Sequence, residues 1–283
     1  MVRWRHCLLV VLLAGCIDTG VEPVSVPLSA AGTSTSGPIL ARHDVPVTLD
    51  RADLAFGPFT VCAGFQAGDN CDSALADWTE AAVIDTLDPV PQRLGNLEGI
   101  GGSARSYMYD HGYVSLLTDT RRLELPAADE LGGSSFVVEG SATVDGVNVP
   151  FRASSVLAQS ASVERGSPIV RSGTDDEFAL ELHADTAPLT VRFDPRSWVE
   201  DIDFRVLSQN ETCAMDQEVV CQLQTELECG PSGEILRETD CSALGLVCAP
   251  DVGCVDRIEL EPGSQGLAAI RNAILAGKPP AFE

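Results

Sequence analysis

The clearest alternation of apolar and polar positions in this chain surrounds the dipeptide Asp145-Gly146. Residues 136–144 and 147–153 carry apolar or small side chains at every second position, with polar side chains at many of the positions between them. A period of two predicts a pair of strands with one buried and one solvated face. Asp-Gly readily adopts the positive φ angles of a type I′ turn, so the two strands are predicted to form an antiparallel hairpin.

Shorter apolar runs recur along the chain, and turn residues separate them. Such spacing is typical of an antiparallel β-sandwich or a jelly-roll-like domain, so a mainly β fold is expected. Residues 73–87 are expected to form a short helix that Pro89 and Pro91 end, and residues 88–106 a loop. Further strands are expected at 45–49, 59–62, 114–117, 156–163, 178–183, 189–193 and 202–207.

The C-terminal segment shows a helical period instead. Ser264 can cap a helix with one apolar stripe, and Gly277 and Pro279 follow as end signals. An amphipathic helix needs a core to cover, so this C-terminal helix is predicted to pack on the β-rich domain. The stripe consists of Leu267, Ile270, Ile274 and Leu275.

The N-terminal segment has a basic start and a short apolar run at residues 7–14, far shorter than the roughly 20 residues of a membrane-spanning helix. It ends in Leu13-Ala14-Gly15-Cys16 and resembles the signal of bacterial lipoproteins, in which a Leu and two small residues precede an acylated Cys. The resemblance implies a cleaved signal peptide at residues 1–15 and a lipid on Cys16, whose acyl chains would anchor the protein in the membrane. Ile17 follows the acylated Cys, at the position where lipoproteins retained in the inner membrane have Asp. The resemblance therefore implies that this protein is located in the outer membrane.

Eight cysteines remain once Cys7 leaves with the signal and Cys16 takes the lipid. An even number suits four disulfides in an oxidising compartment, which agrees with export. Proximity predicts a bond between Cys62 and Cys71. The other six are Cys213, Cys221, Cys229, Cys241, Cys248 and Cys254.

These six cysteines fall within 42 residues that contain few large apolar side chains, so crosslinks must carry much of the stability there. Asp240-Cys241, Gly245-Leu246-Val247-Cys248 and Gly253-Cys254 resemble short cysteine-rich modules of myxobacterial surface lipoproteins. The resemblance implies three disulfides and no activity. It leaves the pairing open.

Residues 16–40 are rich in Pro, Ser, Thr and Gly and are predicted to form a flexible tether. The cysteine-rich module is too small to offer a core to the C-terminal helix, so it is predicted to be an insertion in the β-rich domain. The expected organisation is therefore a signal peptide at 1–15, the tether at 16–40, a β-rich domain at 41–207 plus 255–283, and the module at 208–254.

The formal net charge is −24 at pH 7. Nucleic-acid binding needs clustered Lys and Arg, so this acidity argues against it. It also disfavours contact with anionic lipid except through the acyl chains. The expected partners are the membrane, through the lipid, and an envelope protein or polysaccharide.

The most serious candidate for a chemical site is the stretch around Met108, Asp110 and His111, which His43 or His183 could approach in the fold. Imidazole with thioether suits copper, and imidazole with carboxylate suits zinc, so these three residues are candidate metal ligands. The alternative is that the tyrosines of this stretch line one face of a strand while His111 is solvated or hydrogen-bonded.

Two other metal sites can be considered. Asp69-Asn70-Cys71-Asp72, Asp175-Asp176-Glu177 and Asp201-Ile202-Asp203 offer oxygen ligands for calcium, but none follows the twelve-residue pattern of a helix-loop-helix site. The six module cysteines could bind zinc, although no C-x2-C pair is present and disulfides explain them better.

No motif groups a Ser, a His and an acid, and no G-x-S-x-G is present. The sequence therefore predicts a lipid-anchored envelope lipoprotein with a binding or structural role, no resident cofactor and no catalytic activity. The alternatives are an exported metal-binding accessory protein and an exported hydrolase.

Overall fold

The computed structural model describes most of the chain after the first 21 residues. The predicted signal peptide, Cys16 and Cys71 lie outside the described residues, as do the calcium candidates at 69–72 and 175–177. The described ranges are 22–64, 73–115, 122–157, 169–172, 178–207, 212–214, 218–222, 224–249, 252–276 and 280–283.

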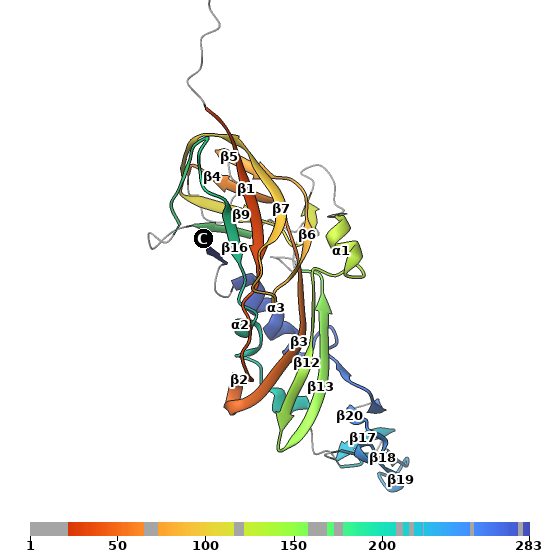
Figure 1. Cartoon of the computed structure of the whole chain (residues 1–283). Coiled ribbons are helices and arrows are strands. Elements are labelled where there is room, and N and C mark those ends of the chain that lie inside the picture. The colour runs from red at the N-terminus through yellow and green to blue at the C-terminus, as the bar shows by residue number, and fades with distance from the viewer. Residues whose placement is uncertain are drawn as a thin grey trace, which may run out of the picture.

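Two sheets form the body of the molecule (Figure 1). Their strands pair mostly antiparallel, with parallel pairs where β16 joins β1 and β22 joins β13. The first sheet runs, in order, β14 (Ile169–Ser172), β9 (Ser106–Tyr109), β4 (Phe59–Cys62), β5 (Ala74–Trp78), β7 (Gln92–Ile100), β1 (Pro23–Ala31), β16 (Leu189–Arg192) and β23 (Ala281–Phe282). The second runs β2 (Ile39–Ala41), β3 (Val45–Phe56), β12 (Phe136–Val144), β13 (Val147–Ser155) and β22 (Ile258–Glu259), with β6 (Ala82–Asp85) also on β3.

Smaller elements complete the body. Two short strand pairs join β8 (Gly102–Ala104) with β15 (Leu180–Leu182) and β10 (Tyr113–Ser115) with β11 (Arg122–Glu124). The α-helices are α1 (Pro126–Glu130), α2 (Arg196–Val199) and α3 (Gln265–Ala276), and the 3-10 turns are η1 (Arg42–Asp44), η2 (Phe204–Leu207) and η3 (Ser242–Leu244). None of the helices in the described part of the chain is long and apolar enough to cross a bilayer.

One hydrophobic core takes side chains from both sheets and from α2 and α3. Leu28 of β1, Phe56 of β3 and Phe136 of β12 are fully buried in it. Both sheets bury their alternating apolar positions against each other and against the helices. The prediction of a mainly β fold is confirmed.

The predicted hairpin is confirmed. Strands β12 and β13 pair in register from Val144 opposite Val147 to Phe136 opposite Ser155. Asp145 and Gly146 both have positive φ, at 50° and 82°, as a type I′ turn requires.

The predicted C-terminal helix is also confirmed. The Ser264 hydroxyl accepts a hydrogen bond from the Leu267 N–H at 3.2 Å, and Leu267, Ile270 and Ile274 are buried in the main core. Strand β22 precedes this helix and belongs to the second sheet, and strand β23 follows it and belongs to the first. The chain therefore leaves the sandwich after Leu207 and returns to it at Ile258.

The prediction of a flexible tether at 16–40 is wrong for the central part of this segment. Residues Pro23–Ala31 form β1, which lies between β7 and β16 in the first sheet, and Ile39–Ala41 form β2. The apolar side chains at Val24, Val26 and Leu28 alternate with exposed or half-buried neighbours. Prolines and serines at the intervening positions conceal this period of two, and burial of the apolar face holds the strand in place.

Three further expectations are corrected. The segment 73–87, predicted to be a helix, contains strands β5 and β6. The predicted loop at 88–106 contains strands at 92–100 and 102–104. The predicted strand at 202–207 is replaced by a 3-10 turn at Phe204–Leu207. Strand β5 is paired on both sides, by β4 and β7, so tertiary pairing overrides its local helical pattern. Gly99 permits the close approach of β7, because a side chain there would meet the backbone of Leu75.

The cysteine-rich module consists of a three-stranded sheet and a hairpin. The sheet contains β17 (Val219–Gln222), β18 (Thr225–Cys229) and β19 (Ile235–Asp240), and the hairpin contains β20 (Val247–Ala249) and β21 (Gly253–Val255). Disulfides join Cys213 to Cys229, Cys221 to Cys248 and Cys241 to Cys254. Figure 1 shows the module beyond the end of the β12–β13 hairpin, while β1 begins at the opposite end of the sandwich.

Candidate functional site

The structure does not bring the three proposed metal ligands together. Along β9 and the residue pair after it, burial alternates, with Tyr107, Tyr109 and His111 buried and Met108 and Asp110 only half-buried. Successive side chains of an extended chain point to opposite faces, so His111 faces the core while Met108 and Asp110 face the other way. These residues therefore do not form one ligand set.

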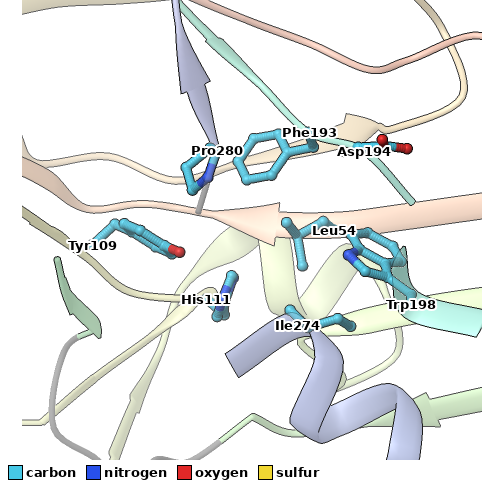
Figure 2. A pocket seen from close by; sticks show the side chains of 8 residues that line it. All are labelled: Leu54, Tyr109, His111, Phe193, Asp194, Trp198, Ile274 and Pro280. Carbon is cyan, nitrogen blue, oxygen red and sulfur yellow. The ribbon is translucent and has the colours of Figure 1, made fainter. Parts of the chain in front are cut away.

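His111 lines a small cavity in the core together with Tyr109 (Figure 2). Its Nδ1 lies 3.3 Å from the carbonyl oxygen of Ala55, and its ring meets the Tyr109 ring edge-on at 5.3 Å between centroids. The cavity has room for about one water molecule. The other lining residues are Leu54, Phe193, Asp194, Trp198, Ile274 and Pro280.

The cavity offers one imidazole among its lining residues, where zinc or copper sites use three or four nitrogen, sulfur or carboxylate ligands. Asp194 also lines it, but its carboxylate accepts hydrogen bonds from the Arg196 guanidinium at 2.7 and 2.5 Å. Figure 2 shows this carboxylate directed away from His111. The cavity residues therefore do not fit a metal ion.

Neither His43 nor His183 is among the residues that line this cavity. His43 Nε2 lies 3.3 Å from the Asp203 carboxylate, and the backbone N–H of His183 donates to the Thr186 hydroxyl at 2.7 Å. Within the described residues, neither belongs to a group of three potential ligands that could hold a metal.

Asp203 also fails as a calcium ligand. Arg205 donates two guanidinium hydrogen bonds to its carboxylate, at 3.0 and 2.9 Å, and these bonds hold the pKa of Asp203 well below its usual range. Within the calcium candidate at 201–203, Asp203 therefore forms an ion pair with Arg205 at the start of η2 and is not an open oxygen ligand.

Asp110 is the one carboxyl group of the described residues whose pKa is raised far. Burial raises it from 3.8 to about 7, because a desolvated carboxylate is less stable than the neutral acid. Its backbone is held at the Gly57-Pro58 corner, where the Asp110 N–H donates to the Pro58 carbonyl at 3.0 Å and the Gly57 N–H donates to the Asp110 carbonyl at 2.9 Å. A carboxyl of this kind can exchange protons near neutral pH, but His111 faces the opposite side and does not pair with it.

The potential ligand group that the fold does assemble lies in the module. It consists of Glu226 on β18, Cys241 after β19 and Cys254 on β21, whose ligand atoms all lie within 4.8 Å of one another. The two sulfurs are joined in a disulfide, so neither is a thiolate ligand in this oxidised form. Sequence reasoning included the two cysteines in its zinc alternative but missed Glu226, since only folding brings β18 to the hairpin.

Apolar side chains on the surface gather on the same module. Eight large hydrophobic side chains are exposed in the described residues, and four of them belong to the module, although the module is a small part of the chain. These four are Ile235, Leu236, Leu244 and Val252. Exposed apolar side chains of this small region are candidates for contact with a partner.

Comparison with family models and with curated proteins finds no match for this chain. Among solved structures, MbnP from Methylosinus trichosporium aligns over 93% of this chain and 98% of its own, at 14% sequence identity and a TM-score of 0.31. A likeness this slight says nothing about function.

Proposed function

We propose that this protein is an exported, lipid-anchored protein of the cell envelope whose β-sandwich carries the cysteine-rich module as a binding surface, without catalytic activity. Disulfides are typical of exported proteins, which supports the compartment. The observation that carries the binding role is the concentration of exposed apolar side chains on the module, at the end of the sandwich opposite to the start of β1 (Figure 1). A lipid on Cys16 would then place the module away from the membrane.

The chemistry of the module indicates what kind of partner it binds. Between Cys213 and Cys254 the chain has eight acidic residues and one basic residue, Arg237, which gives a net charge of −7. An apolar surface within an acidic region favours a partner that combines apolar and basic side chains. An envelope protein with such a surface fits better than a neutral polysaccharide.

The anchor is tested by changing Cys16 to alanine in cells of a Gram-negative host. Wild-type protein is expected in the membrane fraction, because two or more acyl chains anchor stably whereas none leaves only the polypeptide. The Cys16→Ala protein is expected in the soluble fraction or with its signal uncleaved, as measured by fractionation and mass spectrometry of the N-terminus. Membrane association of both forms to the same extent would refute the lipid anchor.

The binding surface is tested by photo-crosslinking in cells. A photoreactive amino acid at Leu236, which is 59% exposed on the module, is expected to give a discrete crosslinked product, because a bound partner lies within reach of the side chain. The matched control is the same amino acid at Leu40 on the sandwich, which is 58% exposed.

The same amino acid at Leu244, which is 61% exposed, provides a second module position, and the comparison of the three positions decides between the outcomes. A product at Leu236 and at Leu244 but not at Leu40 supports a partner on the module. Products of equal yield at all three positions, or none at either module position, would show that the module is not the binding surface.

A further inference from the structure

The disulfide Cys241–Cys254 is arranged so that its two sulfurs share their surroundings with a carboxylate. The Glu226 side chain accepts a hydrogen bond from the Cys254 N–H at 2.8 Å, which fixes its carboxylate beside the hairpin. Gly253 makes room for it, because any side chain at this position would overlap the Glu226 carboxylate. Glu226 is thus held by the fold rather than left in solvent.

The three elements that carry this group are also held together independently of the bond itself. Val247 to Ala249 of β20 pairs with β21, so Cys248 lies directly opposite Cys254. The separate disulfide Cys221–Cys248 ties this hairpin to β17. Opening the Cys241–Cys254 bond would therefore leave the hairpin attached to the sheet that carries Glu226.

Two cysteine sulfurs and one carboxylate oxygen suit zinc, which binds thiolate at about 2.3 Å and carboxylate at about 2.0–2.2 Å in tetrahedral sites. Ligand atoms of such a site lie roughly 3.5–3.8 Å apart, by the geometry of a tetrahedron with these bond lengths. The Glu226 carboxylate lies within 4.8 Å of both sulfurs, and the sulfurs must move apart to this spacing once their bond is broken. Glu226 and Cys254 are both partly exposed, so a water molecule can occupy the fourth position.

We propose that reduction of the Cys241–Cys254 disulfide creates a zinc site formed by Glu226, Cys241 and Cys254. A dithiol reductant transfers two electrons and two protons to the bond, which yields two cysteine thiols and the cyclic disulfide of the reductant. Zinc then replaces the two thiol protons, which leave to solvent, and binds two thiolates and the Glu226 carboxylate. The metal takes over the link that the disulfide provides between the end of β19 and β21.

Of the two disulfides that hold the β20–β21 hairpin, Cys241–Cys254 is expected to open before Cys221–Cys248. Cys221 and Cys248 are both fully buried, whereas Cys254 is partly exposed, and a thiolate must reach a sulfur to attack it. Limited treatment with dithiothreitol followed by alkylation and peptide mass mapping should therefore label Cys241 and Cys254 before Cys221 and Cys248. Labelling of Cys221 and Cys248 before Cys241 and Cys254 would overturn the proposal.

Metal binding is measured on residues 17–283, which contain every described residue, after the dithiol is removed without oxygen. Co²⁺ serves as the spectroscopic probe and Zn²⁺ as its competitor. The reduced protein is expected to bind one Co²⁺ with thiolate charge-transfer absorption that Zn²⁺ abolishes, and the oxidised protein to bind none. Equal binding by the oxidised protein, or no thiolate absorption in the reduced one, would rule the site out.

Variants identify the ligands. Glu226→Gln keeps an acceptor for the Cys254 N–H but removes the carboxylate, and is expected to weaken Co²⁺ binding at least about tenfold, the loss known even for second-sphere changes at metal sites. Glu238→Gln is the matched control, because Glu238 lies opposite Leu227 on the other face of the sheet and carries the same charge. The Cys241→Ser, Cys254→Ser double variant should show no thiolate absorption after the same reduction. Equal affinity of the two glutamine variants would remove Glu226 from the site.

Discussion

Replacing Phe56 with alanine is expected to lower the free energy of unfolding by about 3–5 kcal/mol, the loss found for buried aromatic side chains. Phe56 is fully buried where the two sheets meet. Its ring lies 5.2 Å from that of Phe193 and 5.5 Å from that of Tyr109, and both of these line the cavity beside His111. The alanine would leave a void that these rings cannot fill without moving, because the surrounding strands are paired.

The loss is measured by denaturant unfolding with the disulfides intact, followed by fluorescence of the buried Trp78 and Trp198. Leu123→Ala serves as the control, since Leu123 is 49% exposed on β11 and surface changes usually stay within about 0.5 kcal/mol. A Phe56→Ala loss no larger than that of Leu123→Ala would mean that Phe56 does not pack in the core as described.

Replacing Asp110 with asparagine is expected to stabilise the protein at neutral and alkaline pH and to leave it unchanged below about pH 4. Burial raises the pKa of Asp110 from 3.8 to about 7, so between these values the folded chain binds a proton that the unfolded chain has lost. Stability therefore falls as pH rises through this window, by up to about 1.4 kcal/mol per pH unit. Asparagine resembles the neutral acid in shape and does not ionise, so the variant escapes this loss.

The measurement is the free energy of unfolding of both proteins from pH 3.5 to pH 8.5. The difference should be near zero at the acidic end, grow through the window and level off above pH 7, reaching at most about 4 kcal/mol. Asp201→Asn, at an exposed carboxylate near α2, is the control for the loss of one acidic group at the surface. A constant difference at all pH values would mean that Asp110 ionises alike in both states.

The candidate site shows where sequence reasoning stops. The even number and close spacing of the module cysteines predicted disulfides among them, and this prediction is confirmed. Proximity in sequence grouped Met108, Asp110 and His111, yet adjacent residues of an extended chain point to opposite faces, and the structure separates them. Glu226 beside Cys241 and Cys254 had no signal in the sequence, because three different strands or strand ends supply the group.

The sequence by itself determined the elements whose causes are local. The hairpin around Asp145-Gly146 follows from turn chemistry and a period of two, and helix α3 follows from the Ser264 cap and an apolar stripe. Only the tertiary structure decided that Pro23–Ala31 is a strand within the first sheet and that β5 is not a helix. These segments have weak or conflicting local preferences, so partners distant in sequence decide their conformation: Leu189–Arg192 beside β1, and β4 and β7 on either side of β5.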